Sequence, residues 1–142
     1  MDFKKLFFVL FLFSCGIIFS QDLLQSGPMV GYSTMREALL WVQTKEEAKV
    51  YFEYYEIENP KKRYKTESCR TNIKSGFVAK LIANNILPGK KYAYQVYING
   101  KEVNINYPLE FQSQALWQWR TDPPEVNFAI GSCMYVNEPR FD

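Results

Sequence analysis

The chain has 142 residues, of which 47% are hydrophobic and 17% are aromatic, and its formal net charge is only +2. This hydrophobic content excludes an intrinsically disordered chain, and the small net charge gives no sign of a nucleic-acid-binding surface. The sequence contains no histidine, which excludes a Ser-His-Asp triad or a Cys-His pair within this chain.

The N-terminus has the pattern of an export signal. A short basic start, "MDFKK", precedes the apolar run "LFFVLFLF" at residues 6–13, which is too short to span a bilayer well. We expect residues 1–20 to be a signal peptide, cleaved after Ser20 to release a soluble protein. Two alternatives remain: "LFSC" resembles a lipobox that would put a lipid anchor on Cys15, or the segment stays as an uncleaved anchor. Each predicts an exported protein, periplasmic or extracellular, that contacts membrane only through this segment.

Residues 21–120 have the pattern of an all-β domain. Short stretches of alternating apolar residues are separated by Gly, Pro and Asn, as in a β-sandwich. "SGPMVGYS" is typical of an edge strand. "REALLWVQT" predicts a strand with Ala38, Leu40 and Val42 on one face and Leu39 and Trp41 on the other.

The apolar alternation predicts four more strands in this domain. Three of them lie in "AKVYFEYYEI", "SGFVAKLIANNI" and "YAYQVYING", the last of which ends in the hairpin dipeptide Asn99-Gly100. "KEVNINYPLEFQSQ" predicts a returning strand that presents Val103, Ile105 and Tyr107 on one side. "PKKRYK" at residues 60–65 is the densest basic run, and we interpret it as a solvated loop rather than an anion-binding patch.

One turn predicts the type of sandwich. In "ILPGKKYAYQVYING", a proline turn leads into a strand that begins near Tyr92, with the apolar Ile86 ahead of it. A tyrosine there can bury its ring while its hydroxyl bonds to the turn backbone. The segment resembles the tyrosine corner of fibronectin type III modules. Because no cysteine pair occupies the positions of the inter-sheet disulfide of an antibody domain, a fibronectin-like sandwich is preferred over an immunoglobulin one.

The pattern changes after residue 114. Trp117 and Trp119 alternate around Gln118 and predict a last strand with one ring packed inward. "TDPPE" at residues 121–125 predicts a stiff linker, because two prolines hold the backbone extended. "VNFAIGSC" is then nearly continuous in apolar residues, as in a strand buried on both faces. We therefore place a domain boundary at the linker and assign residues 126–142 to a second domain.

Two stretches carry a resemblance to a known family. "GPMVGYSTMREALLWVQT" is similar to the start of the N-terminal domain of PhoD-like phosphatases, the alkaline phosphatase D family. "LWQWRTDPPEVNFAIGSCMYVNEPRFD" resembles the junction between that domain and the catalytic domain. The resemblance implies that residues 126–142 are the first strand of an α/β metallophosphatase domain, truncated just after it.

The same resemblance implies a metal ligand. In that family, the cysteine at the end of this strand ligates a ferric iron in a site that also holds calcium, and the matching residue is Cys133. The other ligands, histidines included, would come from later loops, so the full-length enzyme would hydrolyse phosphoester substrates while this piece alone would be inactive. A buried, unreactive Cys133 and a disulfide between Cys69 and Cys133 are alternatives. Tyr92, Trp41, Trp117 and Trp119 are expected to be structural.

A second class of function stays open. The sandwich could be a free-standing exported module that binds or adheres to a partner, such as a glycan or a protein, through its tyrosines. That hypothesis leaves "FAIGSC" without a purpose, since an exposed apolar strand promotes aggregation.

Overall fold

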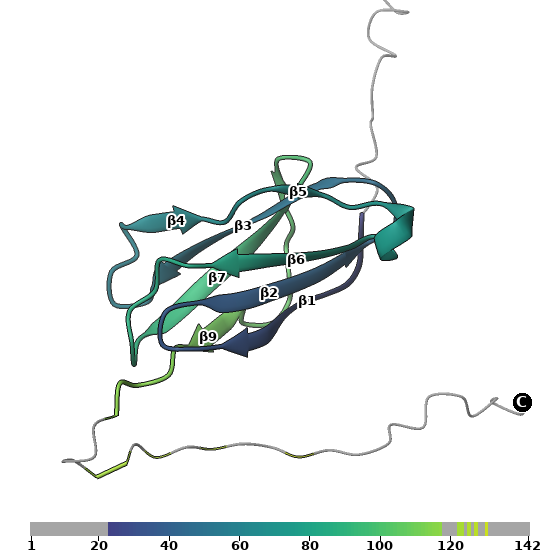
Figure 1. Ribbon diagram of the computed structural model, residues 1–142. Coiled ribbons are helices and arrows are strands. Elements are labelled where there is room, and N and C mark those ends of the chain that lie inside the picture. Colours follow the sequence, from purple (N-terminus) through teal and green to yellow (C-terminus); the bar gives the residue numbers. More distant parts are fainter. Residues whose placement is uncertain (1–22, 118–121, 124, 126, 128–129, 131–142) are drawn as a thin grey trace, which may run out of the picture.

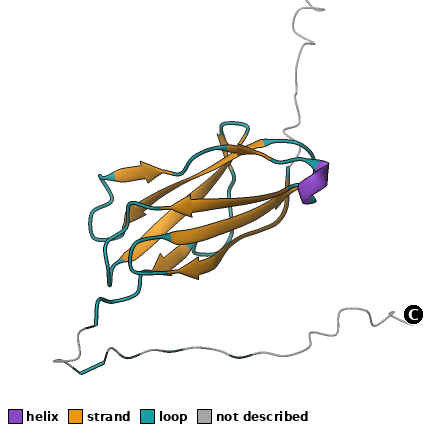
Figure 2. Ribbon diagram, viewed as in Figure 1, coloured by secondary structure: helices purple, strands orange, loops and turns teal. Residues whose placement is uncertain are grey.

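The computed structural model describes residues 23–117, 122–123, 125, 127 and 130. Residues 24–112 form a sandwich of two antiparallel sheets (Figures 1 and 2). The smaller sheet has the strand order β1-β2-β6, and the larger has β4-β3-β7-β8, with β5 paired to β3 and β9 paired to β7. The elements are β1 (Leu24–Ser33), β2 (Ala38–Thr44), β3 (Lys49–Glu56), β4 (Arg63–Lys65), β5 (Cys69–Arg70), η1 (Ile73–Ser75), β6 (Val78–Ala83), β7 (Lys91–Ile98), β8 (Lys101–Glu102) and β9 (Glu110–Gln112).

The predicted all-β sandwich is therefore confirmed. Strands β2, β3 and β7 bury every second residue, because successive side chains of a strand point to opposite faces. Of the two faces predicted for β2, the one with Ala38, Leu40 and Val42 is fully buried, and the one with Leu39 and Trp41 is half-buried. The only helical element among the described residues is the single turn η1, and none of their helices is long and apolar enough to cross a membrane.

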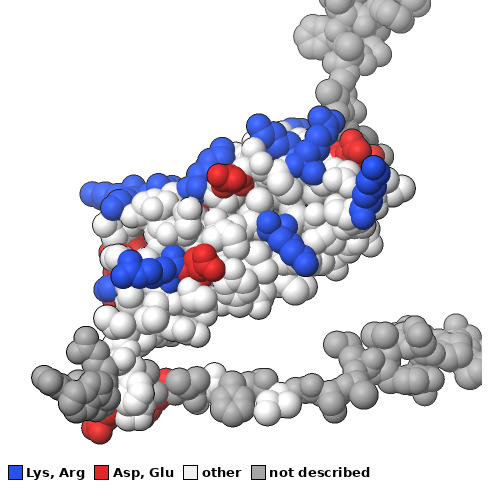
Figure 3. All heavy atoms as spheres, in the orientation of Figure 1, with Lys and Arg blue, Asp and Glu red and all other residues white. Residues whose placement is uncertain are grey.

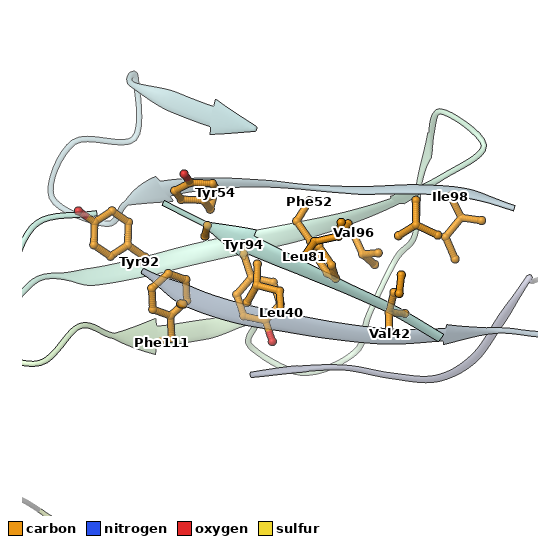
Figure 4. Close-up of a cluster of buried hydrophobic side chains, with 14 of the residues drawn as sticks. Leu40, Val42, Phe52, Tyr54, Leu81, Tyr92, Tyr94, Val96, Ile98 and Phe111 are labelled. Atoms are coloured by element: carbon orange, nitrogen blue, oxygen red, sulfur yellow. The ribbon is translucent and has the colours of Figure 1, made fainter. Parts of the chain in front are cut away.

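The core lies between the two sheets (Figure 4). Leu40 and Val42 of β2 and Leu81 of β6 face the aromatic side chains of the larger sheet. Aromatic rings of the larger sheet, β9 included, contact one another. Phe52 contacts Tyr94 edge-on, and Tyr92 stacks on Phe111. Such ring pairs add to the stabilisation from burial alone.

The β7–β8 connection is a tight hairpin, as "YAYQVYING" predicts. Asn99 and Gly100 both have positive φ, 51° and 79°, which a two-residue hairpin turn of this kind requires. The Asn99 side-chain oxygen accepts a hydrogen bond from the Lys49 backbone N–H at 2.9 Å, which ties the turn to the start of β3.

Two sequence predictions are wrong. The returning strand over residues 101–114 is only the two-residue β8 and the three-residue β9, and residues 103–109 between them form a loop. Val103 and Ile105 are half-buried there, and Tyr107 is exposed. The basic run is also not a loop throughout, because Arg63–Lys65 pairs with β3 as the edge strand β4.

Tyr94 makes the fold sensitive to high pH. Burial raises the pKa of its hydroxyl to about 12, from an ordinary value near 10. Between about pH 10 and 12 the unfolded chain loses this proton while the folded chain keeps it, so stability present below pH 10 is lost as the pH rises. We expect the urea midpoint to fall across this range, and to fall less steeply in Tyr94→Phe. An equal slope in both proteins would contradict this prediction.

Candidate functional site

The sequence-predicted site residues fall in different parts of the molecule. Cys133 and Trp119 lie outside the described residues. The last strand predicted around the two tryptophans is wrong for Trp117, which follows the end of β9 outside any strand with 51% of its surface exposed. Among the described residues, no three His, Cys, Asp or Glu side chains come together as metal ligands would.

Trp41 lies on the outer face of the smaller sheet. It is half-buried on β2 and packs against the backbone of Gly27 on β1, where an added Cβ would lie 3.1 Å from its ring. Figure 3 views the molecule over this sheet, and the centre of that face carries few charged side chains. A structural packing role for Trp41 fits this position.

Tyr92 forms the tyrosine corner that the sequence predicts. Its ring is buried, and its hydroxyl accepts a hydrogen bond from the Leu87 backbone N–H at 2.8 Å. Ile86, at the apolar position of the motif, is 5% exposed. Gly89 has a φ of 72°, a conformation that favours glycine at the tip of this turn.

The same turn holds the segment that leaves the sandwich. The Ser113 hydroxyl donates to the Leu87 carbonyl and accepts from the Lys90 N–H at 2.9 Å. Backbone hydrogen bonds join Gly89 to the Gln114 carbonyl at 3.0 Å and Gln114 to the Thr34 carbonyl at 3.2 Å. We call residues 113–115 the exit segment. It is fixed to the tyrosine corner on one side and to the β1–β2 turn on the other.

Removing the Tyr92 hydroxyl should weaken this corner. In Tyr92→Phe the Leu87 N–H loses its partner inside the protein, so we expect a loss of about 1–3 kcal/mol in the free energy of unfolding, measured with urea. Tyr51→Phe on the outer face is the control, with an expected change within about 0.5 kcal/mol. An unchanged midpoint for Tyr92→Phe would show that the corner bond contributes nothing.

The outer face of the larger sheet carries two rows of side chains, with the paired residues Glu53 and Gln95 between them. In the first row, the rings of Tyr51 and Tyr97 stack with their centroids 4.8 Å apart, and the Lys65 Nζ lies 3.4 Å from the Tyr51 centroid. In the second row, the Arg63 guanidinium carbon lies 4.4 Å from the centroid of Tyr55. We call them the filled row (Lys65, Tyr51, Tyr97, Glu102) and the gapped row (Arg63, Tyr55, Ala93, Glu110).

A hollow of about 250 Å³ lies on this face beside the gapped row. It extends over β7 to the loop that joins β8 to β9. Its walls come from β3, β7, β8, β9 and that loop, and they carry both ring and carboxylate side chains. The polar or aromatic residues that line it are Tyr55, Gln95, Glu102, Asn104, Tyr107 and Glu110, together with Tyr94, whose ring lies in the core.

Hydrogen bonds order one side of the hollow. The Gln95 side-chain oxygen accepts from Arg63 at 2.8 Å, and its amide nitrogen donates to Glu102 at 2.6 Å. Glu110 is opposite Ala93 in the β7–β9 register, and its carboxylate has no hydrogen-bond or ion-pair partner among the described residues.

Sequence reasoning missed the hollow. The alternation of β7 shows that Ala93, Gln95 and Tyr97 share its outer face, but it does not show which residue lies beside Ala93. That neighbour is set by β9, which is only three residues long and gives no periodic signal. A usable signal was the small Ala93 between Tyr92 and Tyr94 in a strand of otherwise large or polar outward side chains.

Cys69 is half-buried on β5, which pairs with β3. It is a free thiol among the described residues. Burial raises its pKa, so the thiol stays protonated and weakly reactive.

The sequence matches the family described as "Domain of unknown function (DUF7800)" over residues 21–116. No curated protein matches the chain.

Solved β-sandwich structures resemble this fold. One is the sensor domain of the anti-sigma factor RsgI4 in Pseudobacteroides cellulosolvens, with 14% identity and a TM-score of 0.49, covering 77% of this chain and 92% of that one. Another is PhoD, with 14% identity and a TM-score of 0.51, covering 61% of this chain and 18% of that one. The match to PhoD thus involves under a fifth of that protein, and the likeness shows a shared fold.

Proposed function

The chain belongs to the DUF7800 family, and from this premise we propose that it supplies the N-terminal β-sandwich of an exported PhoD-like phosphoesterase. Residues 126–142 begin the catalytic domain in this proposal. The sandwich itself is not catalytic. It acts as the platform from which the chain enters that domain.

The observation that carries the proposal is the fixed exit segment. The junction sequence that resembles PhoD-like phosphatases begins at Leu116, directly after residues 113–115. Those residues are held by bonds to two separate turns, at Leu87–Lys90 and at Thr34. Ser113 is 2% exposed, so its hydroxyl bonds are shielded from water. A platform domain needs such an anchored exit, because a free exit would leave the following domain without a defined orientation.

Ion pairs surround the same turn. Lys90 Nζ lies 3.2 Å from the Glu56 carboxylate and 2.6 Å from that of Glu58. These bonds raise the pKa of Lys90 and lower the pKa of Glu58. Exposed pairs contribute little to stability, but they place the end of β3 beside the turn that holds the exit segment.

Cys133 is the residue of this chain proposed to reach the metals. Its thiolate would be one ligand of a ferric iron, in a site that also holds calcium, and the metals would supply Lewis-acid stabilisation of the phosphoester. With no histidine in the chain and no ligand cluster among the described residues, the remaining ligands would belong to other parts of the catalytic domain. The N-terminal segment would direct export to the periplasm or the extracellular space.

The test is phosphoester hydrolysis by two proteins. The 142-residue chain and the full gene product that contains it are each assayed with p-nitrophenyl phosphate and bis(p-nitrophenyl) phosphate, with iron and calcium present. We expect the full gene product to hydrolyse at least one substrate and the 142-residue chain to hydrolyse neither. Activity in the 142-residue chain, or none in the full gene product, would refute the proposal.

A further inference from the structure

The gapped row lacks a ring that the filled row has. In the filled row, Tyr97 of β7 stacks on Tyr51 of β3. In the gapped row, the β7 residue opposite Tyr55 is Ala93, whose methyl group leaves the place above it open. The hollow lies at that place, and Tyr55 and Ala93 are both among its lining residues.

The size of the opening suits one ring. Tyr55, Ala93 and Glu110 are directly paired across three adjacent strands, so the outer two have backbones about 10 Å apart, which is two strand spacings. The volume of about 250 Å³ is also below the roughly 300–1,000 Å³ of sites for drug-sized ligands.

The polar groups suit a neutral, hydroxyl-rich ligand. Glu102 and Glu110 offer carboxylate oxygens to hydroxyl donors, and the side-chain amide of Asn104 offers both a donor and an acceptor. The guanidinium of Arg63 lies at the edge, over Tyr55 and bonded to Gln95. Its positive charge disfavours a cationic ligand, and the two carboxylates disfavour an anionic one.

We propose that this hollow is a glycan-binding site that takes one pyranose unit of a neutral sugar chain. The sugar ring lies over Ala93, with its C–H groups against Tyr55 and its hydroxyls bonded to Glu110, Asn104 and Glu102. This places a ring where the filled row has Tyr97. The proposal does not depend on phosphoesterase activity.

The test titrates the 142-residue chain with soluble cellohexaose, xylohexaose, mannohexaose and chitohexaose. Two-dimensional ¹H–¹⁵N NMR follows the backbone amides, up to about 10 mM sugar, so that millimolar affinities are detected. We expect at least one sugar to shift the amides of Gln95, Asn104 and Glu110, while the amides of β1 and β6 stay unchanged.

Three variants identify the site. Ala93→Phe fills the gap and Tyr55→Ala removes the ring, and each should weaken binding by about tenfold or more, which is at least about 1.4 kcal/mol. Tyr51→Ala is the matched control. Tyr51 lies on the same strand and face as Tyr55 and also has a cation, the Lys65 ammonium, over its ring, but it does not line the hollow. It should change the affinity by less than about twofold. The NMR spectrum of each variant checks that it folds.

Several results would overturn the proposal. One is the absence of shifts with all four sugars. Another is binding that Ala93→Phe and Tyr55→Ala leave intact. The third is tighter binding of a basic peptide, hexalysine, in the same hollow, which would assign the site to a protein partner instead.

Discussion

Replacing Cys133 by alanine in the full gene product should remove most of its phosphoesterase activity. Loss of partners that only support a metal ligand typically costs 10–100-fold in activity or metal affinity, so loss of a ligand itself should cost at least about 100-fold. We expect the bound iron per chain to fall together with the rate, because a thiolate is the soft ligand of the proposed site.

Cys69→Ala is the control for this experiment. Cys69 is the other cysteine after residue 20, and it lies half-buried on β5 as a protonated thiol. We expect the iron content and the rate of this variant to match those of the wild type. Full iron content in Cys133→Ala, or an equal loss in both variants, would contradict the assignment of Cys133.

Replacing Phe52 by alanine should strongly destabilise the sandwich. The Phe52 side chain is fully buried in the core and contacts Tyr94 edge-on at a centroid distance of 6.0 Å. Removing a buried ring costs about 3–5 kcal/mol through lost burial and the cavity left behind. Single domains are stable by only about 5–15 kcal/mol, so the variant would lose a large part of its stability.

Urea unfolding followed by circular dichroism measures the loss for Phe52→Ala. Ile73→Ala serves as the control, because Ile73 is 75% exposed on η1 and should change stability by no more than about 0.5 kcal/mol. A loss of under about 1 kcal/mol in Phe52→Ala would contradict this prediction. It would mean that the core around β3 closes the cavity left by the ring.

The strands that could be predicted are those with a buried and an exposed face. In β2, β3 and β7 the period of two is set by the pleat, so alternation alone predicted these strands. The tyrosine corner was also predictable, because the Pro88-Gly89 turn brings Tyr92, six residues after Ile86, back to the turn backbone. These features depend on neighbours in sequence.

The features that could not be predicted depend on pairing between distant segments. Alternation in residues 103–107 looks like a strand, but Pro108 cannot donate a ladder hydrogen bond, and the chain forms a loop there. Trp117 alternates in the same way, yet it lies outside any strand, after the end of β9. The gapped row depends on Ala93 being opposite both Tyr55 and Glu110, a register that only the folded sheet defines.

The most direct test of the proposed phosphoesterase is metal analysis of the full gene product purified from its exported fraction. We expect about one iron per chain together with calcium, since one thiolate ligand is available at Cys133. We also expect chelation to remove both the metals and the hydrolysis of bis(p-nitrophenyl) phosphate. A purified, folded gene product that binds neither iron nor calcium would contradict the account, as would one whose hydrolysis is unaffected by their removal.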